Sequence, residues 1–87
     1  MKQIYKKDLN FRTRTISHKK ILIGNSKAFE LNDTGYIIWE NIDGRTDVQE
    51  LIKLLVDEYN CSVDEIESDI INFLSFLNSI SAIKAVV

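Results

Sequence analysis

The segment "LNDTGYIIWENIDGRTDVQEL", residues 31–51, lies where the chain changes from a strand-like pattern to a helical one. It contains the only tryptophan of the 87-residue chain and two of its three glycines. Asn32 stands where a helix N-cap belongs. Apolar residues follow it at helical spacing: Tyr36, Ile37, Trp39 and Ile42. Gly44 predicts the end of this helix, and Thr46 with Gln49 predicts a capping box for the next one.

The residues before this segment have the pattern of strands. Many of them are β-branched, and polar turn residues interrupt them at two places. This pattern predicts three short antiparallel strands. Their expected ranges are about Phe11–Ser17, Lys20–Gly24 and Lys27–Leu31.

The residues after the segment are helical in pattern. Apolar positions recur at helical spacing from Val48 to Tyr59, and Ser62 with Glu65 forms a second capping box. A third helix should follow to about Ser79. We expect an α+β fold, a three-stranded antiparallel sheet followed by three helices, as in a winged helix-turn-helix, in one domain over residues 1–87. The tail "AIKAVV" is either a packed segment or an added strand.

Composition limits where the protein acts. The hydrophobic fraction of 45% and the charged fraction of 28% are typical of a globular domain. No apolar run approaches the ~20 residues of a membrane span, and the N-terminus lacks the apolar stretch of a signal peptide. The lone Cys61 fits a reducing compartment. We therefore expect a cytoplasmic protein with no membrane partner.

Charge is divided unevenly along the chain. Residues 1–27 carry eight basic side chains against one acidic one, a balance of +7, whereas residues 28–87 carry three against twelve, a balance of −9. Two explanations are open at this stage. Either the two parts attract each other within the fold, or the basic part forms a surface for a partner.

A winged helix-turn-helix raises the question of DNA binding. A recognition helix needs basic or amide side chains that reach bases and phosphates. The first two turns of the expected third helix are instead acidic: Asp64, Glu65, Glu67 and Asp69. Such a helix would be repelled by the duplex, so we expect no nucleic-acid partner.

No residue pattern indicates chemistry. The only histidine and the only cysteine, His18 and Cys61, are far apart in sequence, whereas a zinc site needs three or four ligands. A catalytic cysteine would need a base that nothing in the sequence places beside it. The three glycines form no phosphate-binding loop. We expect no metal, no cofactor and no enzyme activity.

The expected third helix carries more apolar surface than a core stripe requires. Phe73, Phe76 and Ile80 extend the stripe along one side, and Asp69 lies at the N-terminal end of this extension. These residues predict an apolar groove, unless the tail or the sheet covers them. A groove beside a sheet edge suits an extended peptide that adds a strand to that edge.

The central segment resembles the PqqD-like family, the RiPP recognition elements of peptide natural-product biosynthesis. The matching positions are Leu31, Asn32, Gly35, Ile38, Trp39, Ile42, Asp43, Gly44, Thr46, Val48 and Leu51. The resemblance covers roughly Lys20 to Ile83. It implies a winged-helix-like fold of three strands and three helices, and a role without catalysis. Members bind the leader of a ribosomally made precursor peptide and present it to maturation enzymes.

The resemblance also implies a peptide-binding site. The implied strand residues are Lys27, Ala28, Phe29, Glu30 and Leu31, and the implied helix residues are Asp69, Phe73, Phe76, Leu77 and Ile80. The implied partners are a precursor leader peptide and a maturation enzyme such as a leader peptidase or cyclase. We favour lasso-peptide biosynthesis, with the chain acting in trans. The alternatives are a peptide chaperone for the radical-SAM enzyme of pyrroloquinoline quinone (PQQ) assembly and a winged-helix DNA-binding regulator, and a homodimer is left open.

The sequence departs from the family pattern at two places. Many relatives end the third helix with a glycine, where this chain has Ile80-Ser81-Ala82-Ile83. The basic turn "SHKK", residues 17–20, is not part of the pattern either. It is a candidate contact for the partner enzyme or for an acidic leader.

Overall fold

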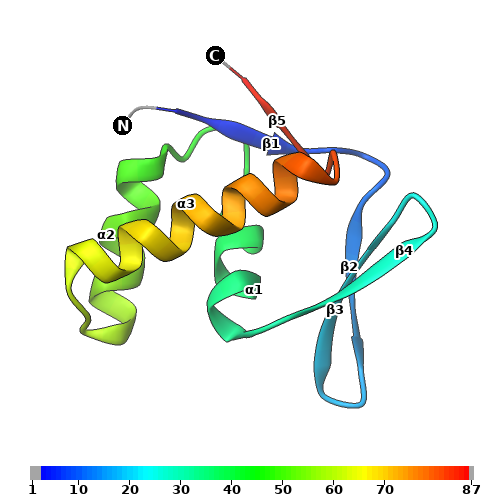
Figure 1. Cartoon of the computed structure of the whole chain (residues 1–87), viewed down its shortest axis with the longest axis horizontal. Helices are drawn as coiled ribbons and strands as arrows, with labels where there is room; N and C mark the ends of the chain where they lie inside the picture. The colour runs from blue at the N-terminus through cyan, green and yellow to red at the C-terminus, as the bar shows by residue number, and fades with distance from the viewer. Residues whose placement is uncertain (1–2, 87) are drawn as a thin grey trace.

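The structure is a computed structural model that describes residues 3–86 (Figure 1). Its elements in chain order are β1 Tyr5–Lys7, β2 Arg12–Ile16, β3 Lys19–Gly24, β4 Lys27–Leu31, α1 Asp33–Glu40, α2 Val48–Tyr59, α3 Val63–Ser79 and β5 Ile83–Ala85. The run from β2 to α3 confirms the expected order of three strands and three helices. The sequence did not predict β1.

The main sheet is antiparallel with the order β2-β3-β4. Two-residue turns join its strands: Ser17 and His18 in the first, Asn25 and Ser26 in the second, all at positive φ. Turns with two positive φ values match the right-handed twist of paired strands, so they fix the register of both hairpins. The strand β4 is left at one edge of the sheet.

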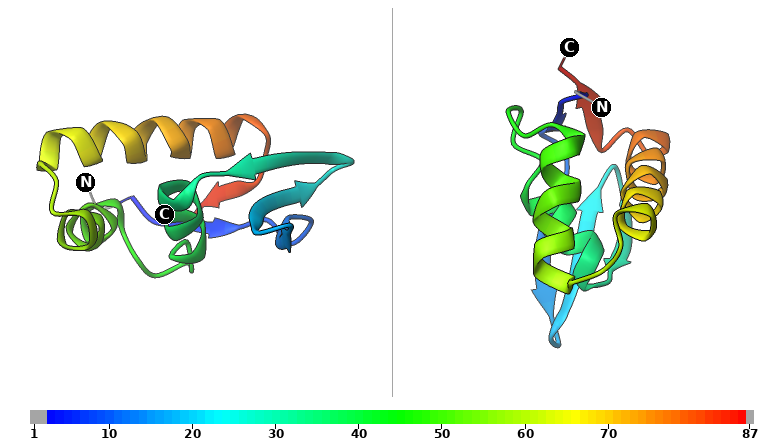
Figure 2. Two further views of the ribbon diagram at one scale, coloured as in Figure 1. Left: turned by 90° about the horizontal axis from the view of Figure 1, so that it is seen from below. Right: turned by 90° about the vertical axis from the view of Figure 1, so that its left-hand side faces the viewer.

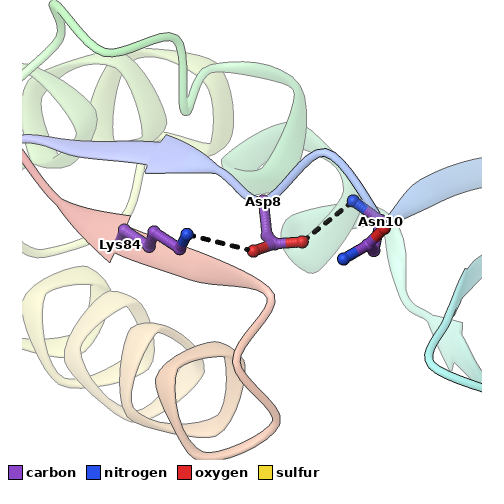
Figure 3. Close-up of polar contacts among 3 residues, drawn as sticks. All are labelled: Asp8, Asn10 and Lys84. Carbon is purple, nitrogen blue, oxygen red and sulfur yellow. Dashed lines mark hydrogen bonds and ion pairs between the residues drawn. The ribbon is translucent and has the colours of Figure 1, made fainter.

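A second sheet joins the two ends of the chain, because β1 pairs antiparallel with β5. The tail therefore forms a strand, except that its last residue, Val87, lies outside the described residues. The loop after β1 is attached to β5 through Asp8, whose carboxylate accepts the Asn10 N–H at 2.9 Å and lies 3.5 Å from the Lys84 ammonium (Figure 3). The Asn10 bond first, and then Lys84, hold the pKa of Asp8 below its usual value.

The first helix begins as predicted and ends earlier. Asn32 caps it by accepting the Gly35 N–H at 2.7 Å. Its end is not at Gly44 but at Glu40, because the side chain of Asn41 donates to the carbonyl of Ile37 at 2.8 Å and closes the last turn. Gly44, at φ +81°, lies in the following loop.

The caps of the other helices test two predicted capping boxes. The box of α2 is not Thr46 with Gln49 but Asp47 with Glu50, one residue later, and both of its bonds are present. Thr46 instead donates through its hydroxyl to Asp43 at 3.1 Å. At α3 half of the predicted box forms: the Ser62 hydroxyl accepts the Glu65 N–H at 3.3 Å, whereas among the described residues no bond from the Ser62 N–H to the Glu65 side chain completes it.

One hydrophobic cluster connects the three helices with the strands β3, β4 and β5. It includes Trp39 and Ile38 of α1, Leu55 of α2, Leu77 of α3 and Leu22 of the sheet, each at most 2% exposed. The views in Figure 2 show α3 lying across the other two helices, with β4 running out beneath its C-terminal half. This arrangement places the free edge of the sheet next to α3.

Candidate functional site

The outer edge of β4 has backbone groups available for another strand. Gly24 and Lys27 flank the two-residue turn, which makes them a hydrogen-bonded pair, and such pairs alternate along an antiparallel ladder. The N–H and C=O groups of Ala28 and Glu30 therefore point away from β3. An extended peptide can pair with these two residues.

The side chains of β4 alternate between the two faces of the sheet. Phe29 faces α3, where its ring meets the ring of Phe76 edge to face at 5.2 Å between centroids. Phe73 continues this row one turn earlier on the helix, 6.1 Å from Phe76. All three rings are half-buried and retain exposed surface. They form an apolar wall beside the free edge of β4.

The wall continues toward the start of α1, where a small hollow of about 220 Å³ opens. Its lining consists of Asn32, Thr34, Gly35, Ile38, Asp69, Asn72 and Phe73. Gly35 lets α1 approach α3 here, because a Cβ at this position would meet the Phe73 ring at 3.2 Å. We call β4, this hollow and the aromatic wall the β4–α3 groove.

Eight of the ten predicted site residues lie at the surface, and all of these except Ile80 belong to the β4–α3 groove. Lys27, Ala28, Glu30 and Asp69 are exposed, and Phe29, Phe73, Phe76 and Ile80 are half-buried. The other two, Leu31 at 6% and Leu77 at 0% exposed, lie in the core. These two side chains hold β4 and α3 in place and do not reach the surface.

Five residues that line the hollow were not among the predicted site residues: Asn32, Thr34, Gly35, Ile38 and Asn72. Gly35 was noted only as a position of the family pattern, and Asn72 was not noted at all. Asn72 could have been found by extending the apolar side of α3 on a helical wheel, since it projects on the same side as Asp69 and Phe76. What such a wheel does not show is that α1 packs against this side.

Elsewhere among the described residues, the structure shows no grouping of side chains typical of a chemical site. A larger depression of about 580 Å³ beside α2 is lined mostly by exposed polar and charged side chains, among them Glu50, Lys53, Asp57 and Glu58. Among residues 3–86, no three His, Cys, Asp or Glu side chains are grouped so that they could hold a metal ion. Within the same residues, no helix is long and apolar enough to cross a membrane.

A family comparison matches most of this fold. The model described as "Coenzyme PQQ synthesis protein D (PqqD)" matches residues 14–82, from β2 to the residue before β5. The chain belongs to the PqqD family. A comparison with curated proteins found no match.

Solved structures share the fold of this PqqD-family chain. The PqqD truncation of Methylobacterium extorquens PqqCD, described as a functional and stand-alone RiPP recognition element, is 23% identical, with a TM-score of 0.79 over 93% of this chain and 88% of that one. TbiB1 in complex with the TbiA(beta) leader peptide is 20% identical, with a TM-score of 0.79 over 91% and 94%. Lasso peptide synthetase B1 complexed with the leader peptide is 16% identical, with a TM-score of 0.80 over 92% and 96%.

Proposed function

We propose that this chain is a non-catalytic recognition element. It binds the leader segment of a ribosomally synthesised precursor peptide and delivers the peptide to maturation enzymes. The observation that carries the proposal is the free β4 edge, where outward-pointing backbone groups of Ala28 and Glu30 lie beside the ring of Phe76. Membership of the PqqD family supports it, as do two solved structures of the same fold that contain a leader peptide.

The groove offers an extended peptide two kinds of contact. Backbone pairing with Ala28 and Glu30 supplies affinity that does not depend on the leader sequence. Every second leader side chain then faces Phe29, Phe73 and Phe76, and these contacts select apolar residues. Ordering a flexible peptide costs ~2–5 kcal/mol of the gross interaction, so a dissociation constant between micromolar and nanomolar is expected.

We favour lasso-peptide maturation in the cytoplasm as the pathway, with a leader peptidase or a cyclase as the enzyme partner. Support comes from the solved lasso peptide synthetase B1, which has this fold. A chaperone for a radical-SAM enzyme in PQQ assembly is the second candidate, supported by the family model. DNA regulation is disfavoured because Asp64, Glu65 and Glu67 are exposed or half-buried on the first two turns of α3.

Calorimetric titration with a synthetic leader peptide tests the proposal. The leader should bind with a dissociation constant in the micromolar range or below, whereas the core peptide of the same precursor should not. A series of leaders with a single backbone N-methyl group should lose affinity at alternate positions, because only every second N–H of an added strand pairs with β4. Equal binding of a scrambled leader would contradict the proposal.

A further inference from the structure

The β4–α3 groove does not have the same chemistry along its whole length. Its centre is the aromatic wall of Phe29, Phe73 and Phe76. Beyond Phe73 the wall ends at the hollow of about 220 Å³, where four of the seven lining residues are polar: Asn32, Thr34, Asp69 and Asn72. The hollow therefore suits a different kind of leader side chain from the one that the wall selects.

The polar groups at this hollow are largely free to bind a ligand. Asn32 uses its side-chain oxygen to cap α1, by accepting the Gly35 N–H at 2.7 Å. In the part of the chain that the structure describes, the side chains of Thr34, Asp69 and Asn72 make no hydrogen bond or ion pair. A ligand here meets the Asp69 carboxylate beside a hydroxyl and an amide, and all three can accept hydrogen bonds from a cation.

The bottom of the hollow is apolar. Ile38 is 1% exposed, and the half-buried Phe73 ring lies beside it in the lining, whereas Asp69 is exposed at the rim. Lysine and arginine combine an aliphatic stem with a cationic head, so the stem can cover Ile38 and Phe73 while the head reaches Asp69. The Phe73 ring attracts a cation as well. An apolar bottom with an acidic rim thus matches this class of side chain.

We infer that the hollow is a subsite for one lysine or arginine side chain of the bound leader peptide. The inference rests on the proposed function and adds a basic residue to the apolar ones that the wall selects. A neutral side chain would leave the Asp69 carboxylate without a counter-charge, and an acidic one would be repelled by it. The subsite therefore distinguishes among leaders that the aromatic wall alone would accept equally.

The two ends of the groove differ in charge, which places the basic residue within the leader. Lys27 is exposed at the start of β4, whereas the hollow lies beside Asn32, directly after the end of this strand. An added strand continues the antiparallel pattern of the sheet when it runs antiparallel to β4, and its N-terminal part then lies at the hollow. Since every second side chain faces α3, the basic residue should precede the residue at Phe76 by an even number of positions.

Selection from a phage-displayed library of random dodecapeptides tests the subsite without knowledge of the natural leader. Peptides retained by the parent protein should have alternating apolar residues, with a lysine or arginine before them at even spacing. Asp69→Asn should remove the preference for this basic residue, and Asp69→Lys should replace it by a preference for aspartate or glutamate. The apolar residues should stay the same in all three selections. The matched control is Asp57→Lys, at an exposed position of α2, which should keep the basic preference.

Calorimetry with one selected peptide then measures the interaction itself. Replacing the basic residue of the peptide by glutamine should raise its dissociation constant for the parent about fivefold, the effect of one exposed ion pair at the upper end of its range. The same replacement should change the dissociation constant for Asp69→Asn by less than about twofold, because the carboxylate that it pairs with is already absent.

The outcomes separate this inference from the proposed function. If the parent selects alternating apolar residues without a basic one, or if the basic preference survives in both Asp69 variants, the hollow is not a cation subsite, although the groove still binds a strand. If the basic residue follows the apolar ones, the order assigned to the leader is wrong. If Phe76→Ala retains the same peptides as strongly as the parent does, they bind outside the groove, and the proposed function is contradicted as well.

Discussion

Phe76 is the residue on which the β4–α3 groove depends most, because its ring joins β4 to α3. Replacing a fully buried phenylalanine by alanine costs ~3–5 kcal/mol of unfolding free energy. Phe76 is half-buried, so Phe76→Ala should cost about half of that, ~2 kcal/mol, and should lower the melting temperature by ~8–16 °C. Domains of this size have ~4–13 kcal/mol of stability, so the variant should remain folded.

The effect of Phe76→Ala on leader binding follows from the same ring. A leader side chain that covers roughly 60–80 Å² of apolar surface here gains ~1.5–2 kcal/mol, so its loss should raise the dissociation constant ~10–30-fold. Calorimetry at 10 °C keeps the variant folded, and circular dichroism of the same sample checks this. The matched control is Ile71→Ala, on the opposite side of α3, where the residue is 38% exposed. The reasoning is refuted if Phe76→Ala binds the leader within twofold of the parent, or if Ile71→Ala weakens binding as much.

Three further predictions concern the helix ends. Gly35→Ala should weaken leader binding several-fold, because the new Cβ displaces the Phe73 ring from the groove; unchanged affinity would show that the ring yields without cost. Asp47→Ala should lower the unfolding free energy by about 1 kcal/mol, whereas Gln49→Ala should change it by less than ~0.5 kcal/mol in urea titrations. Asp43→Asn should lower the free energy of unfolding, and this loss should be largest above about pH 4 and should decrease as the pH falls below it. The reason is that the N–H groups of the next turn hold the folded pKa of Asp43 below its usual value, so the charged carboxylate stabilises the folded state. A difference in stability that stays constant down to pH 2 would contradict this.

Local signals in the sequence were sufficient for most of the fold. The hairpins were predictable because polar turn residues, Ser17 with His18 and Asn25 with Ser26, lie between β-branched runs. The cap of α2 was misplaced by one residue because Thr46 and Asp47 are both good N-caps, and the side chain of Thr46 turned out to bond Asp43. Competition between adjacent candidates of this kind is settled by the surrounding loop, not by the local sequence.

Pairing between strands that lie far apart in the sequence was harder to predict from the sequence. The sheet formed by β1 and β5 joins segments from opposite ends of the chain, and each strand has only three residues. Such short strands have no recognisable period of their own. The groove was predicted as a region, but Leu77 was placed in it although it is buried, because a helical wheel gives the direction of a side chain and not what packs against it.

The central claim is that the leader pairs with the β4 edge, and amide hydrogen exchange tests it residue by residue. With leader present at 100 times its dissociation constant, the amide protons of Ala28 and Glu30 should exchange about 100-fold more slowly than in the free protein. Those of Thr13 and Thr15, which point outward from the other edge of the sheet, should be unaffected. Protection of the two threonines, with no change at Ala28 and Glu30, would contradict the account.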